Sequence, residues 1–188
     1  MKKMNNKGFS LVELIIVIAI MAILAGALAP ALISYVAKSR RSTTVSNAQT
    51  IASAIQSAIS DEAVLDDLET NYTSIGKTPI KFKKGTGNVD TTKAFGETVN
   101  SNVSGGIDSY ATLKATKFSK KAKDTKLQNA AITATDGYYI SIDPASSTIK
   151  IYVMSGVAPT TKGTAADGTA LTSNLIEVYP NADDAMTK

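Results

Sequence analysis

Asn5–Val36, NNKGFSLVELIIVIAIMAILAGALAPALISYV, is the stretch that decides the fold. From Phe9 to Val36 its only strongly polar side chains are those of Ser10, Glu13 and Ser34, so hydropathy predicts one membrane-spanning helix. Residues 9–29 alone would form a helix about 32 Å long, which matches a hydrocarbon core of about 30 Å. Glu13 is the exception, because an ionised carboxylate deep in a spanning helix costs on the order of 2.5 to 3.5 kcal/mol and less near the interface.

The residues before this run are typical of a processed leader. Residues 1–8, MKKMNNKG, are basic and end in a small residue, Gly8, at the border of the apolar run. A cut between Gly8 and Phe9 would keep the helix and create an α-amine with a pKa of about 7.7 to 8.0, a cationic partner for Glu13. A cut at the small residues 25–29, as in ordinary secretory signals, would instead leave the helix behind. Without a cut, Glu13 would snorkel to the headgroups from a simple anchor.

The run Lys7-Gly8-Phe9-Ser10-Leu11-Val12-Glu13-Leu14, followed by an apolar helix with a proline at Pro30, resembles the class III signal peptide of type IV pilins and pseudopilins. The resemblance implies that a prepilin peptidase, a membrane aspartyl protease, cuts after Gly8 and methylates the new N-terminus, Phe9. It further implies that Glu13 neutralises the N-terminal amine of a neighbouring subunit during assembly.

Gly26 and Pro30 weaken the same helical turn. Pro30 has no N–H and its ring crowds the carbonyl of Gly26, which is itself a poor helix former. One interpretation is an ordinary kink, which transmembrane helices tolerate. The other, implied by the resemblance, is a region that unwinds in the assembled filament.

Beyond Val36 we expect the helix to continue as an amphipathic half, residues 37–60. Its apolar stripe has spacings of three and four and consists of Val45, Ala48, Ala52, Ile55 and Ile59. Just past the apolar run, Lys38, Arg40 and Arg41 would meet lipid headgroups. The stretch DEAVLDDLETNY marks a turn away from the helix near Asp61. The predicted organisation is therefore a leader (1–8), a membrane and filament-core half (9–36), an amphipathic half (37–60) and a globular head (61–188).

The head is expected to consist mostly of antiparallel strands. Alternating runs predict strands at Tyr138–Asp143 and Thr148–Met154, joined in a hairpin through Pro144 to Ser147. Further strands are expected at Leu175–Tyr179 and Leu127–Thr135. Between strands, VAPTTKGTAADGTALTSN (157–174) predicts a long surface loop. The predicted fold class is α+β: a long N-terminal helix, with its hydrophobic half protruding, packed on an antiparallel sheet in a pilin-like arrangement.

Composition limits the chemistry. The chain has no Cys, His or Trp, so thiol catalysis, histidine-based triads and cysteine or histidine zinc sites are excluded. We therefore predict no enzyme and no cofactor. Many pilins close a C-terminal loop with a disulfide, and this sequence departs from that pattern, as Gram-positive relatives of the family do. The acidic tail suggests a calcium site. Calcium takes six to eight oxygen ligands, however, and Asn181, Asp183 and Asp184 are too few to supply them, so no metal site is predicted.

Charge is distributed unevenly. The leader lysines account for most of the net charge of +4. Acidic residues gather at Asp61, Glu62, Asp66, Asp67 and Glu69, and basic residues at Lys114, Lys117, Lys120, Lys121, Lys123 and Lys126. These clusters are solvated faces, or opposite patches that meet between subunits, or, for the lysines, a surface that captures DNA or acidic polymers.

Three functional interpretations follow. The first is a type IV pilus subunit that waits in the cytoplasmic membrane, is processed by prepilin peptidase and is extruded by an assembly ATPase and a platform protein. The resulting homo-oligomeric surface filament would act in adhesion, twitching motility or biofilm formation. The second is a pseudopilin of a type II secretion or competence system. The third is a membrane-anchored or secreted binding protein.

Overall fold

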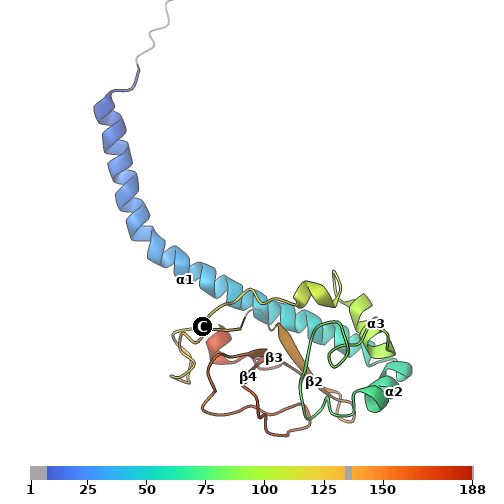
Figure 1. The fold of residues 1–188 in the computed structure, drawn as a ribbon. Helices are drawn as coiled ribbons and strands as arrows, with labels where there is room; N and C mark the ends of the chain where they lie inside the picture. The colour runs from blue at the N-terminus through green and yellow to red at the C-terminus, as the bar shows by residue number, and fades with distance from the viewer. Residues whose placement is uncertain (1–7, 134–136, 188) are drawn as a thin grey trace, which may run out of the picture. The chain divides into compact units, whose positions relative to one another are not determined.

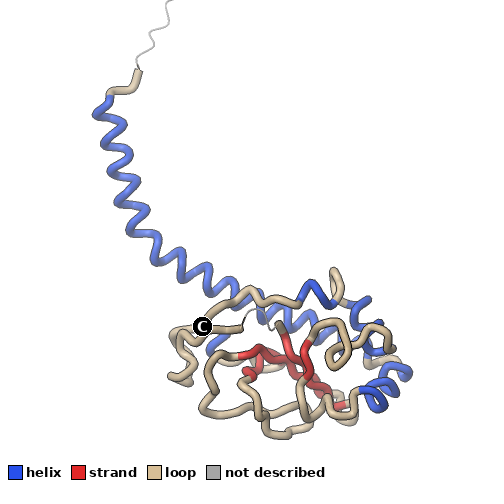
Figure 2. Tube along the Cα trace, viewed as in Figure 1, coloured by secondary structure: helices blue, strands red, loops and turns tan. Residues whose placement is uncertain are grey.

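The computed structural model describes residues 8–133 and 137–187, and the chain divides into two compact units, Met1–Val36 and Ala37–Lys188. The long helix α1 (Leu11–Ala58) begins in the first unit and ends in the second, which we call the head unit. The remaining helices and a four-stranded sheet belong to the head unit (Figures 1 and 2). The α+β prediction, a long N-terminal helix with an antiparallel sheet, is confirmed.

Within the head unit α1 is amphipathic and buries one face. The predicted stripe lies on that face: Ala48, Ala52, Ile55 and Ile59 are buried, and Val45 packs partly buried against the same core. The face is wider than predicted, since it also includes Ile51, Ala54 and Ala58. The helix ends at Ala58, close to the predicted Asp61, which caps the next helix by accepting a hydrogen bond from the Ala63 N–H at 2.9 Å.

The sheet is an antiparallel meander in the order β1 (Ile80–Lys81), β2 (Tyr138–Asp143), β3 (Thr148–Met154) and β4 (Leu175–Tyr179). The predicted hairpin is confirmed: β2 and β3 pair with Ile140 opposite Ile151, and Ser147 adopts a positive φ of 53° in the connecting turn. The predicted strand at Leu175–Tyr179 is β4. The alternation in these runs therefore specified their bounds.

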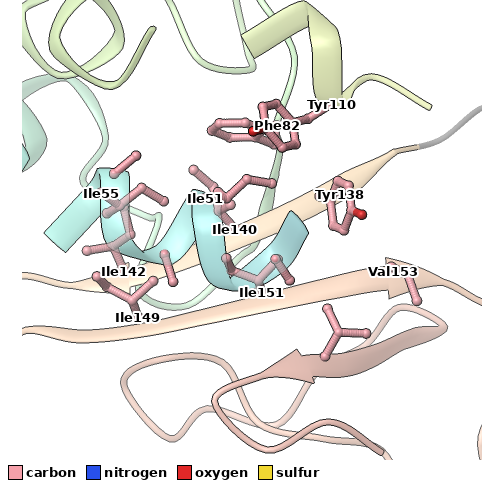
Figure 3. Close-up of a cluster of buried hydrophobic side chains, with 14 of the residues drawn as sticks. Ile51, Ile55, Phe82, Tyr110, Tyr138, Ile140, Ile142, Ile149, Ile151 and Val153 are labelled. Carbon is pink, nitrogen blue, oxygen red and sulfur yellow. The ribbon is translucent and has the colours of Figure 1, made fainter. Parts of the chain in front are cut away.

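The core lies between α1 and the sheet. Ile51 and Ile55 of α1 face Ile140, Ile142 and Ile151 of the two central strands, and all five are fully buried (Figure 3). Burial of an isoleucine side chain contributes about 1.5 to 3 kcal/mol, so this helix-on-sheet layer contributes substantially to the stability of the head unit.

A buried tyrosine joins the same two elements. The Tyr138 hydroxyl, at the start of β2, donates to the Thr44 carbonyl of α1 at 3.0 Å. Burial raises the pKa of Tyr138 to about 12, because the phenolate would lose its hydration.

The predicted strand at Leu127–Thr135 is wrong over its described part, residues 127–133. Only single bridges form there, Lys117 with Ala131 and Ile132 with Ser155. Asn129 has a positive φ of 58°, which interrupts an extended run, and β1 occupies the position beside β2. Ala134 and Thr135 lie outside the described residues.

Three helices of the head unit were not predicted: α2 (Glu62–Asn71), α3 (Ala94–Asn102) and α4 (Asp184–Thr187), together with a 3₁₀ turn, η1 (Ile107–Tyr110). The stretch interpreted as a turn after Asp61 is therefore itself a helix. Its buried residues Val64 and Leu68, four positions apart, give it a narrow apolar face.

The loop at residues 157–174 connects β3 and β4, and its described residues form no helix or strand, as predicted. It is nevertheless anchored. Ala165 and Leu171 of the loop form a small separate cluster with Tyr152 and Leu175. The loop's neck is closed by a hydrogen bond from the Ser155 N–H to the Asn174 carbonyl at 2.8 Å.

Candidate functional site

The first unit contains the predicted processing position and the apolar helix behind it. Gly8 and Phe9 precede the helix in an irregular segment, and the Phe9 side chain is 92% exposed. A side chain built at Gly8 would contact nothing within 4 Å. The peptide bond between these two residues is thus open to solvent on the Phe9 side and unhindered at Gly8. Residues 1–7 of the predicted leader lie outside the described residues.

Glu13 forms a capping box at the start of α1. Its carboxylate accepts a hydrogen bond from the Ser10 backbone N–H at 2.8 Å, while the Ser10 hydroxyl accepts one from the Val12 N–H at 3.3 Å. The first N–H groups of a helix have no partner within the helix and require other acceptors. The Glu13 carboxylate and the Ser10 hydroxyl are two such acceptors. Ser10-x-x-Glu13 is the sequence signature of this motif, so the role of Ser10 was readable from the sequence and was missed.

The apolar side chains behind the cap are exposed. Between Leu11 and Val36, the exposed fraction of the large hydrophobic side chains ranges from 40% at Val36 to 74% at Leu11. By length and composition α1 is able to cross a membrane, and it is the one helix of the described residues that passes this test. Such a surface needs lipid or other protein around it.

The helix runs without a break through Gly26 and Pro30. Pro30 has no N–H to donate to the Gly26 carbonyl, and the position of a side chain at Gly26 is open space. The turn at Gly26 and Pro30 therefore lacks one helical hydrogen bond, as predicted, although its backbone is helical in this structure. Its unwinding in a filament stays a prediction.

A family model described as "Prokaryotic N-terminal methylation motif" matches residues 3–29. Comparison with curated proteins finds no match to this chain, and neither does comparison with solved structures. The N-terminal segment is therefore a class III signal peptide of the type IV prepilin kind, with a methylation motif and a transmembrane-type helix. The motif supports a pilin-like or pseudopilin-like prepilin. It implies processing by prepilin peptidase, membrane anchoring before assembly and handling by a pilus-type assembly machinery.

In the head unit, the predicted acidic cluster is divided by the structure. Asp61, Glu62, Asp66 and Glu69 are exposed, whereas Asp67 is buried. One oxygen of the Asp67 carboxylate accepts a hydrogen bond from the Phe95 N–H at 2.8 Å, and the other accepts one from the Asn71 side chain at 2.6 Å. Asp67 therefore joins α2 to the start of α3, and it does not belong to a solvated face.

All six predicted lysines from Lys114 to Lys126 are exposed. Of the three basic residues expected at the headgroups, Lys38 and Arg40 are exposed but Arg41 is buried, with 7% of its surface exposed. Arg41 is therefore part of the head unit's packing and cannot reach a lipid surface without leaving it.

The tail residues considered for calcium do not converge on one point. Asp183 accepts a hydrogen bond from the Ala185 N–H at 2.7 Å, and Asp184 lies 3.9 Å from the Lys123 ammonium. Among the described residues no group of three His, Cys, Asp or Glu side chains could hold a metal ion.

The nearest hollow, of about 500 Å³, lies along β4 and is lined in part by Asp124, Glu177 and Asp183. These carboxylates are already engaged. Asp124 accepts from the Thr160 N–H, which lowers the pKa of Asp124, and Glu177 lies 3.4 Å from the Lys150 ammonium. All three carboxylates therefore already take part in contacts within the head unit.

Proposed function

We propose that the chain is a structural subunit of a type IV pilus. Prepilin peptidase cuts it between Gly8 and Phe9 and methylates Phe9, and an assembly ATPase with its platform protein extrudes it from the cytoplasmic membrane. The mature subunits then pack through the apolar part of α1 into a filament at the cell surface, which would serve adhesion, twitching motility or biofilm formation. The observation that carries the proposal is the methylation motif over residues 3–29, followed by an exposed apolar helix.

Physical chemistry supports the step from anchor to filament. An apolar helix that leaves the bilayer needs another apolar environment, and copies of itself provide one. A heterologous contact that repeats without closing generates an open helical assembly. The head and its loop at residues 157–174 favour a surface pilus over a pseudopilus, since both would be displayed on the outside of such a filament.

The first experiment is mass spectrometry of the N-terminal peptide from material sheared off the cell surface, combined with electron microscopy. A peptide that begins at methylated Phe9, together with extracellular fibres, is the expected result. Methylated Phe9 confined to the envelope without fibres would favour the pseudopilin. A start after Ala27 or Ala29, or an intact Met1, would contradict the proposal.

A pair of variants tests the assembly role of Glu13. Glu13→Gln keeps an acceptor for the Ser10 N–H but removes the charge, whereas Glu13→Ala removes both. If the carboxylate neutralises the Phe9 amine, both variants are inserted and cut, yet both yield at least about tenfold fewer filaments, the factor that corresponds to about 1.4 kcal/mol per contact. Normal assembly of Glu13→Gln beside failure of Glu13→Ala would assign Glu13 to capping and remove the pairing.

A further inference from the structure

The lysine segment, residues 114–126, presents its six lysines on a fixed backbone. The apolar residues between and beside them are buried in the core: Leu113, Ala115, Phe118, Ala122 and Leu127. Backbone bonds hold the segment in place, from the Phe118 N–H to the Ala130 carbonyl at 3.1 Å and from the Ser119 N–H to the Ala185 carbonyl at 2.8 Å. The lysines therefore form a patch of defined position instead of a loose charged loop.

Most of this positive charge is not compensated within the chain. In the described ranges Lys123 is the only one of the six in an ion pair, with Asp184 at 3.9 Å. The segment contains one acidic residue, Asp124, whose carboxylate accepts hydrogen bonds from the Thr160 and Lys126 N–H groups.

An acidic counterpart lies on α2. Glu62, Asp66 and Glu69 are exposed at spacings of four and three, so they share one face of the helix; we call them the acidic stripe. The helix contains no lysine or arginine, and none of the three residues is in an ion pair within the described part of the chain.

The two patches lie at opposite ends of the head unit. In Figure 1, α2 is at one end, and the red helix α4 is at the other. The lysine segment lies against α4, through the bond between Ser119 and Ala185 and the ion pair between Lys123 and Asp184. Opposite charges at opposite ends of one body are the arrangement that a head-to-tail contact between copies requires.

We infer that the lysine segment of one subunit docks on the acidic stripe of the next copy, as a second contact of the filament beside the apolar helix. The inference rests on the proposed function. A second copy explains both patches, whereas a nucleic acid on the lysines would leave the acidic stripe without a partner. The contact is electrostatic and peripheral, so it should weaken as salt shortens the screening length from about 10 Å at 0.1 M to about 3 Å at 1 M.

Charge reversal in full-length protein, expressed in cells that assemble the wild type, tests the contact. The lysine variant carries Lys117→Glu, Lys120→Glu and Lys121→Glu. The stripe variant carries Glu62→Lys, Asp66→Lys and Glu69→Lys. Each should lower the yield of sheared filaments at least about tenfold, because like charges then face each other, and the combination should recover most of the yield.

A matched control reverses the same number of positive charges elsewhere on the head unit. It carries Lys77→Glu, Lys83→Glu and Lys93→Glu, three exposed lysines outside the segment. Its filament yield should equal that of the wild type. Equal losses in the control and the lysine variant would show that net charge alone matters, which would overturn the contact.

Wild-type filaments provide a test that needs no variant. A zero-length carbodiimide should join lysines 114–126 to α2 carboxylates, and mixed isotope labelling should show that the two peptides come from different copies. Absence of these cross-links overturns the inference. This test also decides the case in which the combined variant does not recover its filament yield. A lysine variant that assembles normally but no longer retains duplex DNA would assign the segment to nucleic acid instead. Absence of any wild-type filament would refute the proposed function itself.

Discussion

Removal of the Asp67 carboxylate should destabilise the head unit by about 2 to 3 kcal/mol. Lys93 precedes α3 and gives that helix no side-chain cap, so Asp67 supplies the acceptor for the Phe95 N–H from a different helix. A hydrogen bond to a charged group contributes about 1.5 to 3 kcal/mol, and a lost helix cap costs about 0.5 to 2 kcal/mol, two figures that describe the same bond and overlap. Phe95 is fully buried, so in Asp67→Ala its N–H would find no water as a substitute.

The assay is thermal unfolding of the full chain in detergent micelles, followed by near-ultraviolet circular dichroism of the head tyrosines. For a chain of this size, 2 to 3 kcal/mol corresponds to a Tm lower by about 5 to 10 °C. Asp66→Ala is the matched control, because it removes the same charge from the adjacent, exposed position of α2, and it should change stability by less than about 0.5 kcal/mol. Equal shifts in the two variants would refute the capping role and leave only a charge effect.

Three further predictions concern the packing of the head unit. Gly96→Ala should lower its stability by about 3 kcal/mol in the same assay, because the new Cβ would overlap the backbone carbonyl of Asp90, and a shift below about 1 kcal/mol would contradict that close approach. Ser141→Ala should cost about 1 to 3 kcal/mol in urea unfolding, because the buried hydroxyl donates to the Ile75 carbonyl at 2.8 Å and accepts from the Ala166 N–H at 2.9 Å; wild-type stability would argue against this link. Tyr138 should make the fold sensitive to alkali: its folded pKa of about 12 exceeds an unfolded value of about 10, so its contribution is intact below pH 10 and declines by about 1.4 kcal/mol per pH unit up to pH 12. Burial also raises the pKa of Tyr152, so Tyr138→Phe should reduce the alkaline slope by the Tyr138 share and leave that of Tyr152, and an unchanged slope would assign the alkaline transition to other groups.

The parts of the fold that were predicted correctly are those with an uninterrupted hydrophobic period. β2, β3 and β4 were predicted with their observed bounds, because apolar residues that recur over five to seven positions between turn residues specify a strand. α2 and α3 were missed, since they are short and polar and each buries only three residues. β1 has two residues, and a two-residue strand exists only because β2 offers it an edge.

The candidate site also contains features that could be predicted from the sequence and features that could not. The match over residues 3–29 agrees with the class of signal predicted from Gly8, Phe9 and Glu13, because that signal is local in sequence. The partner of Asp67 lies far away in the chain, at the start of α3, so its hydrogen bond to the Phe95 N–H could not be predicted from local sequence, although Asp67 and Arg41 both have the helical spacing of a buried face.

In the loop at residues 157–174, the residues that hold the loop in place are different from the residues that are exposed on its surface. The first set consists of the hydrogen bond between Ser155 and Asn174 and the separate cluster that contains Ala165 and Leu171. Because Ala165 and Leu171 fix the loop from within, exposed threonines such as Thr161 and Thr172 can be exchanged without disturbing the sheet, whereas Thr164 is tied to β3 by the Lys150 ammonium at 2.9 Å. If the head is presented many times along a fibre, this loop is the position where an antibody epitope or a foreign peptide could be grafted in repeated, evenly spaced copies.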